Sequence, residues 1–439
     1  MKRLLALFLL VLTLLPLAAC AGSCMGNDEN TLYFLNFKPE SAAAYQEIAQ
    51  KYKEETGVTL RVVTAASGTY EQTLKSEISK SDPPVLFQLN GMIGYNAWRD
   101  YCKDLSKTTV YQHLLDKSLA ITSGSGVYGV PTAVEGYGII YNKALTDRYF
   151  ALASRATSFI SMDEVNSFSK LRALVEDMTA HKDELGIKGV FAATSLKSGE
   201  DWRTHTHLAN LPIYAELKNA EPTDKVSEVT FSYDKEYKQI LDLQLDNSTT
   251  DKKLLGSKQV ADSMAEFALG QCVMVQNGNW AWSQIAEVGG NTVKEENIKF
   301  LPLYIGLEAE ESQGLCVGTE TYFAINSKAS PEKQKMAEDF LAWLYTSDSG
   351  KDLVTNNLGF IAPYDTFEDD EAPRDPLGRE VYEWMNKEGT ESVPWIFSIF
   401  PSQNFKNDFG AALLQYAQGT KTWNDVKSVF VTRWKEEAA

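Results

Sequence analysis

The sequence is poor in positive charge and in histidine. Its 439 residues include 42 lysines and arginines against 59 acidic residues, which gives a formal net charge of −17. This balance argues against a nucleic-acid-binding protein, because phosphate backbones are bound by basic surfaces. It disfavours anionic ligands only weakly, since an acidic protein can hold a local basic pocket. An acidic surface mainly indicates solubility.

Cysteines are also few, and their spacing predicts no disulfide framework. Cys20 and Cys24 lie near the start of the chain, and Cys102, Cys272 and Cys316 are scattered along the rest. A bridge between Cys272 and Cys316 stays open, but two buried free thiols are the favoured interpretation.

The usual catalytic and nucleotide-binding motifs are missing. The chain has no GxSxG, HExxH or GxxxxGK[ST] pattern, and no GxGxxG follows its first predicted strand. His205 and His207 would not share one face of a helix, so we expect surface histidines here rather than a metal site. We therefore predict no catalytic residue, no metal and no cofactor.

One long apolar run is present, at the start of the chain. Lys2 and Arg3 precede the run 4–15, which is too short to span a bilayer and is typical of a secretory signal. The sequence Leu17-Ala18-Ala19-Cys20 that follows resembles the lipobox of bacterial lipoproteins. That resemblance implies that residues 1–19 are removed, that Cys20 carries lipid, and that residues 20–30 tether the protein to the outer face of the cell membrane.

The remaining chain predicts an α/β protein with more than one core. Removal of 19 residues from 439 leaves 420, which is too many for one typical core, so two lobes are expected. Strands are predicted at 31–37, 58–64 and 84–89, with helices between them, and this alternation implies parallel strands. Ligands of such sheets lie beyond the carboxyl ends of the strands.

Strands and helices also alternate in the later parts of the chain. The strands expected there are 138–142, 189–194, 272–275 and 316–326. A helix is predicted from Pro331, with Ser330 as its N-cap, and helical patterns fill most of 376–435.

Two segments resemble a known family. Val134-Glu135-Gly136-Tyr137-Gly138-Ile139-Ile140-Tyr141-Asn142 resembles the hinge-and-strand segment of maltose-binding-type proteins. Met274-Val275-Gln276-Asn277-Gly278-Asn279-Trp280-Ala281-Trp282 resembles their short strand and Asn-Gly-x-Trp-x-Trp turn. The order of elements fits as well, so the chain resembles the carbohydrate-binding class of extracellular solute-binding proteins of ABC importers over nearly all of 31–435.

The resemblance implies two discontinuous lobes that are joined by hinge strands and close over a ligand in the cleft between them. Lobe one would comprise 31–132 and 317–364, and lobe two 133–316 and 365–439. The protein would be a monomer that captures a carbohydrate, expected to be an oligosaccharide, and delivers it to the membrane subunits of the permease.

A sugar site needs aromatic rings for the apolar ring face, and carboxylates, amides and charged donors for the hydroxyls. Trp280 is the leading stacking candidate by its family position, with Trp282 beside it, and Glu135 holds the family's hydroxyl-accepting position. The other candidates are Lys38, Glu40, Ser67, Tyr70, Asn90, Tyr137, Trp202, Asn279, Glu320, Tyr322, Trp395 and Phe397. Structural alternatives are a surface pair of Lys38 with Glu40, a hinge ion pair at Glu135, and a helix cap at Asn279.

Two other functions stay open. One is a binder of a non-sugar solute such as a peptide or a polyamine. The other is a surface glycosidase or lyase, whose carboxylate pair could not be named among so many acidic residues.

Overall fold

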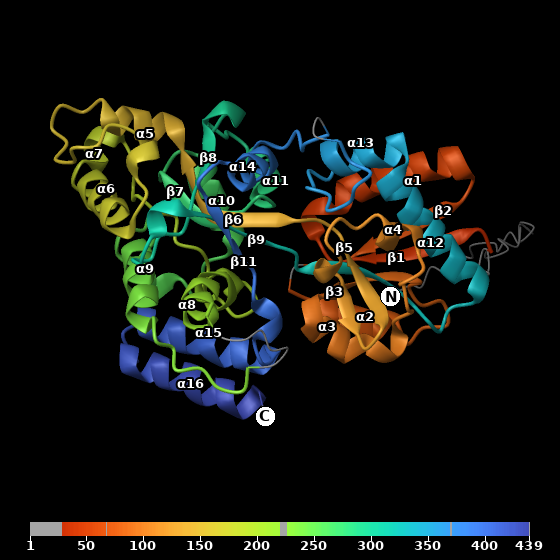
Figure 1. Ribbon diagram of the computed structural model, residues 1–439. Coiled ribbons are helices and arrows are strands. Elements are labelled where there is room, and N and C mark those ends of the chain that lie inside the picture. Colours follow the sequence, from red (N-terminus) through yellow and green to blue (C-terminus); the bar gives the residue numbers. More distant parts are fainter. Residues whose placement is uncertain (1–28, 67, 220–225, 369–370, 439) are drawn as a thin grey trace, which may run out of the picture.

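The computed structural model describes residues 29–66, 68–219, 226–368 and 371–438. The chain forms two lobes, each built on its own β-sheet with helices packed around it (Figure 1). This is the α/β architecture that the sequence predicts. The predicted signal sequence, Cys20 and most of the tether lie outside the described residues.

Lobe one contains a six-stranded sheet in the order β2-β1-β3-β10-β5-β4. Its strands are β1 (Thr31–Asn36), β2 (Thr59–Thr64), β3 (Leu86–Asn90), β4 (Ile121–Ser123), β5 (Gly126–Pro131) and β10 (Thr321–Ile325). Strand β1 pairs in parallel with β2 and β3, as predicted, whereas β10 runs antiparallel to β3 and β5. The helices of this lobe are α1 (Ala42–Thr56), α2 (Tyr70–Glu77), α3 (Gly91–Trp98), α4 (Thr109–Gln112), α12 (Pro331–Thr346) and α13 (Asp348–Asn356).

Lobe two is organised around β6 (Glu135–Asn142), which is buried along its whole length. The sheet has the order β11-β9-β6-β7, and β8 also pairs with β6. The other strands are β7 (Met274–Gly278), β8 (Ile298–Leu301), β9 (Gln313–Gly318) and β11 (Glu391–Pro394). The helices are α5 (Lys143–Phe150), α6 (Phe168–Ala180), α7 (Lys182–Leu185), α8 (Ala209–Leu217), α9 (Asp234–Asp246), α10 (Val260–Ala268), α11 (Ala281–Ala286), α14 (Pro376–Met385), α15 (Gln403–Ala417) and α16 (Trp423–Ala438).

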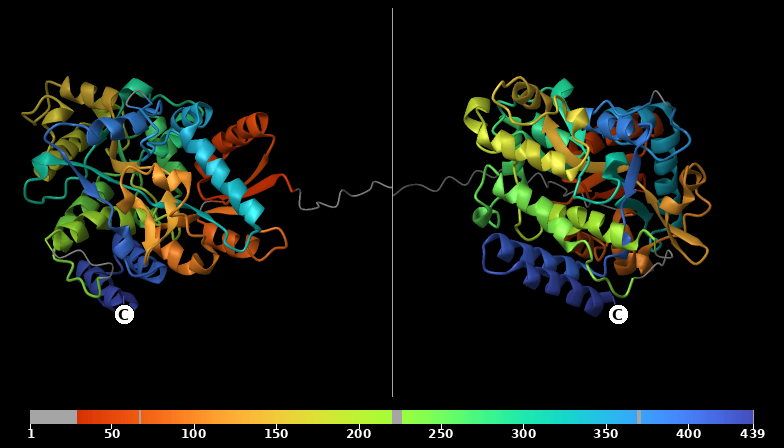
Figure 2. Two further views of the ribbon diagram at one scale, coloured as in Figure 1. Left: turned by 45° about the vertical axis from the view of Figure 1, so that its right-hand side comes forward. Right: turned by 60° about the vertical axis from the view of Figure 1, so that its left-hand side comes forward.

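Local sequence signals account for many of these elements. Helix α1 ends at Gly57, whose φ of 77° is a backbone conformation that favours glycine. Helix α12 begins as predicted, because Ser330 Oγ accepts a hydrogen bond from Lys333 N and Pro331 occupies the first turn. At the far end of the chain α15 packs against α16 at the edge of lobe two (Figure 2), where the rings of Phe405 and Phe430 meet edge to face.

Within the described residues, the chain passes between the lobes three times. It crosses between β5 and β6, between β9 and β10, and again between α13 and α14. The crossings are bonded to one another: Thr132 N donates to Thr321 O at 2.9 Å, and Val134 N donates to Ile361 O at 2.8 Å. The residue numbers at which each lobe begins and ends remain a prediction.

Some predicted strands are wrong in extent. The segment 316–326 forms two strands in different sheets, with Cys316 in β9 and Tyr322 in β10, because the chain changes lobes between them. The segment 189–194 forms only isolated bridges, from Phe191 to Ser248 and Met274. The strand predicted at 272–275 begins at Met274 and continues to Gly278. These errors have one cause: an apolar run in the sequence indicates that a segment is buried, but it does not show which strand, if any, the segment pairs with.

The prediction of buried free thiols at Cys272 and Cys316 is confirmed, and Cys102 is also buried and free. No helix in the part of the chain that the structure describes is long and apolar enough to cross a bilayer.

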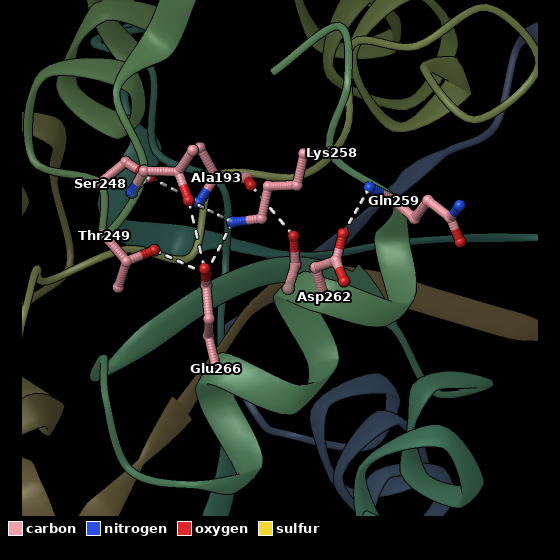
Figure 3. A network of polar contacts seen from close by, with 9 residues as sticks. Ala193, Ser248, Thr249, Lys258, Gln259, Asp262 and Glu266 are labelled. Atoms are coloured by element: carbon pink, nitrogen blue, oxygen red, sulfur yellow. Dashed lines mark hydrogen bonds and ion pairs between the residues drawn. The ribbon is translucent and has the colours of Figure 1, made fainter. Parts of the chain in front are cut away.

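A buried ion pair fixes the start of α10 to the neighbouring loops of lobe two (Figure 3). Lys258 Nζ lies 2.6 Å from Glu266 Oε2, and the Lys258 side chain is 4% exposed. Glu266 also accepts a hydrogen bond from Thr249 Oγ1 at 2.6 Å, and Ser195 Oγ donates to Lys258 O at 2.6 Å. The ion pair thus fixes the side chain of Lys258, while its backbone carbonyl holds Ser195.

We expect Glu266→Gln to lower the free energy of unfolding by about 2 kcal/mol, because the buried Lys258 ammonium loses its counter-charge. Urea denaturation at neutral pH measures the change. The matched control is Glu296→Gln, which removes an exposed pair with Lys294 and should change stability by less than about 0.5 kcal/mol. Equal effects of the two substitutions would contradict this role for the buried pair.

Candidate functional site

Charged residues from both lobes meet at the hinge. Lys38 follows β1 in lobe one, and Glu135 is the first residue of β6 in lobe two. Lys38 Nζ donates to Glu135 Oε1, and both side chains are less than 10% exposed. The hinge ion pair considered for Glu135 is thus present, and the surface pair of Lys38 with Glu40 is not. Burial disfavours the Lys38 ammonium, but Glu135, with help from Glu40, raises its pKa overall.

Two other carboxylates in this region, Glu40 and Glu320, lie near cations without contacting them. Glu40 and Glu320 are half-buried, and neither forms an ion pair with any residue that the structure describes. Burial raises the pKa of both carboxyl groups, and Lys38 partly offsets this for Glu40. The oxygens of both groups are therefore available as hydrogen-bond acceptors.

The structure adds Lys406, which the sequence analysis missed. Lys406 lies on α15, where its side chain is buried beside Phe400, and among nearby charges it has the largest effect on Glu320. Burial lowers the pKa of Lys406, and Glu320 opposes the shift. The sequence carried one signal for a buried lysine here. Lys406 directly follows Phe405, which begins the buried face of α15 that continues at Phe409.

Aromatic rings from lobe two surround His207. The ring of His207 lies 4.3 Å from that of Tyr137, 4.7 Å from Trp202, 5.5 Å from Trp280, 5.7 Å from Trp395 and 5.0 Å from Phe397, measured between centroids. We call these six residues the aromatic cluster. All five aromatic partners of His207 were predicted site residues, although they come from four separate stretches of the chain.

The prediction of surface histidines at 205 and 207 is wrong. Both lie in a π-helical turn, Arg203–Leu208, in which all six residues are buried. The expectation assumed a helix with one solvent-facing side, and this turn has none. Burial lowers the pKa of His207 well below its usual value, so its ring is neutral at neutral pH. His205 instead pairs with Asp201, with 3.5 Å between Nε2 and Oδ1.

The aromatic cluster contains buried polar atoms that have no partner. Among the described residues, five buried side-chain nitrogen or oxygen atoms lack a hydrogen bond, and three of them are His207 Nε2, Trp280 Nε1 and Trp395 Nε1. An unsatisfied buried polar group costs about 1–3 kcal/mol. This concentration therefore favours a site that is completed by a polar ligand.

A fourth unpaired atom, Thr319 Oγ1, lies beside the cluster. Thr319 directly follows Gly318, the last residue of β9, and precedes Glu320. Trp395 packs against this point, because a Cβ atom on Gly318 would lie 2.5 Å from its ring. The unpaired Thr319 hydroxyl and the unpaired Trp395 indole therefore flank the same crossing between the lobes.

Trp202 is held in place by Arg203. The guanidinium of Arg203 lies 3.8 Å from the centroid of the Trp202 ring, and its Nε donates to Asn277 Oδ1 at 2.9 Å. Arg203 also attracts Glu40 of lobe one electrostatically. The sequence analysis missed this arginine, because nothing in the sequence showed that the turn 203–208 is buried.

Two predicted tyrosines of lobe one have structural partners. The Tyr70 hydroxyl donates to Gln88 O and accepts from Gln88 N, at 2.8 and 2.7 Å, so it fastens α2 to β3. The Tyr322 hydroxyl donates to Thr319 O at 3.3 Å. Both hydroxyls are therefore already bonded within the protein.

Three predicted polar residues lie at chain turns. The side chain of Asn279 does not cap α11, since its Oδ1 accepts from Gly136 N at 3.0 Å and ties the turn to β6. Asn90 stands at the start of α3, and Ser67 lies outside the described residues.

A cavity of about 380 Å³ opens between the lobes beside these groups. The predicted residues that line it are Lys38, Glu40, Glu135, Asn279, Trp280 and Trp282. The lobes also touch elsewhere, since α3 of lobe one contacts the short turn Phe397–Ile399 of lobe two. The described residues include no group of three or more histidine, cysteine or acidic side chains that could hold a metal ion.

Comparison with known proteins identifies the family of this chain and the solved structures that share its fold. Residues 47–377 match the family of bacterial extracellular solute-binding proteins. No curated protein matches the chain in sequence. Among solved structures, a chitin oligosaccharide binding protein is similar with a TM-score of 0.69 and 15% identity, over 93% of this chain and 99% of the other.

Two further structures are similar over 92% of this chain and 99% of theirs. Maltose-bound MalE3 of T. maritima has a TM-score of 0.68 and 13% identity. The binding protein RafE in complex with raffinose has a TM-score of 0.65 and 18% identity. At these identities the likeness shows the fold. Because the family match covers well over half of its length, the chain belongs to the bacterial extracellular solute-binding proteins.

Proposed function

We propose that this protein is the substrate-binding subunit of an ATP-driven importer and that it captures a carbohydrate between its lobes. The observation that carries the proposal is the aromatic cluster with its unpaired ring nitrogens, next to the unpaired carboxylates of Glu40 and Glu320. Aromatic faces suit the apolar side of a sugar ring, and the polar atoms suit its hydroxyls.

The aromatic rings, rather than the charges, favour a sugar over the polyamine that the sequence left open. The cavity is lined by five acidic residues and by two basic residues, Lys38 and Arg374. Trp280 and Trp282, which also line it, offer the apolar ring faces that a sugar needs and that a polyamine does not require.

Similar structures support the same ligand class. They are a chitin oligosaccharide binding protein, a maltose-bound protein and a protein in complex with raffinose. The family and these structures are binding proteins, which supports binding and transport rather than glycoside hydrolysis in this chain.

Closure over the ligand would follow from contacts on both sides. Lys38 and Glu40 come from lobe one, whereas Trp280 and His207 come from lobe two. A ligand that contacts both lobes favours the closed state over the open one, by the difference in its affinity for the two states. The closed protein would then dock on the permease subunits.

We also propose that lipid on Cys20 anchors the mature protein to the membrane. Two observations support this proposal. The sequence contains Leu17-Ala18-Ala19-Cys20, and the chain belongs to a family of extracellular proteins.

We expect Trp280→Ala to weaken sugar binding by about 30-fold or more, equivalent to about 2 kcal/mol, because a buried aromatic anchor is lost. Calorimetry measures this with the tightest binder among maltotriose, raffinose, stachyose, xylotriose and chitotriose. The control is Trp384→Ala, since Trp384 lies on α14 and contacts Lys387 instead of the aromatic cluster. Unchanged affinity of a folded Trp280→Ala protein would reject the assignment.

Binding should also depend on pH through Glu320. Burial raises the pKa of this carboxyl, and its ionised form is the better acceptor for sugar hydroxyls. Affinity should therefore fall as the pH is lowered below neutral, because the raised pKa brings protonation above the ordinary range of a glutamate. Glu320→Gln should weaken binding at neutral pH by about 10-fold and reduce the pH slope.

The control for this prediction is the exposed Glu296→Gln, which should keep the wild-type pH profile. Calorimetric titrations across the pH range measure both variants. An unaltered slope in Glu320→Gln would count against the prediction.

Replacement of Cys20 by alanine should abolish labelling with radioactive palmitate and move the protein from the membrane fraction to the soluble fraction. The control is Cys24→Ala, a little further along the chain, which should keep both properties. Persistent labelling of the Cys20→Ala protein would show that another residue carries the lipid.

A further inference from the structure

Two buried cations of lobe two have no carboxylate in contact with them. Arg203 is 4% exposed and Lys406 is 6% exposed. Neither forms an ion pair with any residue that the structure describes, and the Arg203 guanidinium donates only through Nε, to Asn277 Oδ1. Buried charges are normally paired, because an unpaired ion loses its hydration without compensation. Both side chains therefore keep unused donors inside the protein.

Positive charges also surround His207, at the centre of the aromatic cluster. Burial is the main reason that the pKa of His207 is low, and four neighbouring groups lower it further: Arg203, Lys406, His205 and Lys38. No carboxylate is among these principal influences on the ring. The electrostatic environment of the cluster therefore favours negative charge.

The unpaired neutral atoms of the cluster lack acceptors in the same way. The indole nitrogens of Trp280 and Trp395 can only donate, whereas His207 Nε2 and the Thr319 hydroxyl can donate or accept. Trp280 lines the cavity between the lobes and also packs against His207, so these donors lie beside that cavity. A ligand that satisfies them must be rich in acceptor oxygens.

The free carboxylates come from the other side of the cleft. Glu40 lies in the turn Pro39–Ser41 of lobe one, and Glu320 lies at the crossing between β9 and β10. Each is influenced by nearby cations without contacting one. The cleft thus has a side of donors on lobe two and a side of acceptors opposite to it.

We propose that the ligand is an acidic carbohydrate, and that Arg203 and Lys406 bind its anionic group, a carboxylate or a sulfate ester, on lobe two. This inference rests on the proposed function, because it names the class of sugar for the same cleft. A guanidinium matches the two oxygens of such a group, and an ammonium adds a point charge. The hydroxyls of the sugar would then donate to Glu40 and Glu320. A neutral sugar would leave both cations without a counter-charge.

The test compares ligands that differ in charge and little else. Trigalacturonate is paired with its methyl ester, xylotriose that carries a glucuronate with plain xylotriose, and sulfated neocarrabiose with unsulfated neocarrabiose. Calorimetry at neutral pH gives each affinity. The anionic member of at least one pair should bind about 10-fold or more tightly, because a charge-assisted contact is stronger than a neutral one. The pair that shows the preference distinguishes a carboxylate from a sulfate ester.

Three variants then locate the anionic group. Lys406→Met keeps the length of the side chain without its charge, and it should lower the ratio of acidic to neutral affinity by about 10-fold. Lys406→Arg restores a cation and should keep most of the ratio. The matched control is Lys387→Met, since Lys387 is an exposed lysine that contacts Trp384, and its ratio should equal that of the wild type.

The outcomes separate the two proposals. If the wild type binds neither these sugars nor the neutral oligosaccharides used for Trp280→Ala, the proposed function fails. If sugars bind, but the neutral member of every pair binds as tightly as the acidic one, only the acidic ligand class is overturned. If an acidic sugar is preferred and Lys406→Met keeps the full ratio, the assignment of its anionic group to this position is overturned.

Discussion

Lys38 and Glu135 form a buried ion pair whose members belong to different lobes. Either charge alone in this position would cost several kcal/mol, because a buried ion loses its hydration. The pair is therefore compatible with burial only while the lobes stand close together. Everything else in the cleft, from the half-buried Glu40 to the cavity beside Trp280, depends on this approach of the two lobes.

The site combines satisfied and unsatisfied groups in one place. Lys38 and Glu135 satisfy each other, whereas Glu320, Lys406 and the nitrogens of the aromatic cluster keep bonding capacity. The Lys38–Glu135 pair limits the free energy that burial of charge costs when the lobes close. The remaining groups can form new hydrogen bonds with a polar ligand. A buried π-helical turn places His207, and the other rings of the aromatic cluster pack around it.

Much of the fold could be predicted because local signals and tertiary structure agree. The alternation of strand and helix over 31–89 sets the parallel pairing of β1 with β2 and β3. The prediction failed where the chain changes lobes, at 316–326, since two successive strands in different sheets give one continuous apolar pattern. It failed again at 189–194, where burial does not come with a regular strand partner.

The order of residues along the chain already places an acidic residue at the start of β6 and two tryptophans at the start of α11. These features follow from local order along the chain, so they need no knowledge of packing. Arg203, His207 and Lys406 join them only through packing, because their burial depends on helices that meet from distant parts of the chain.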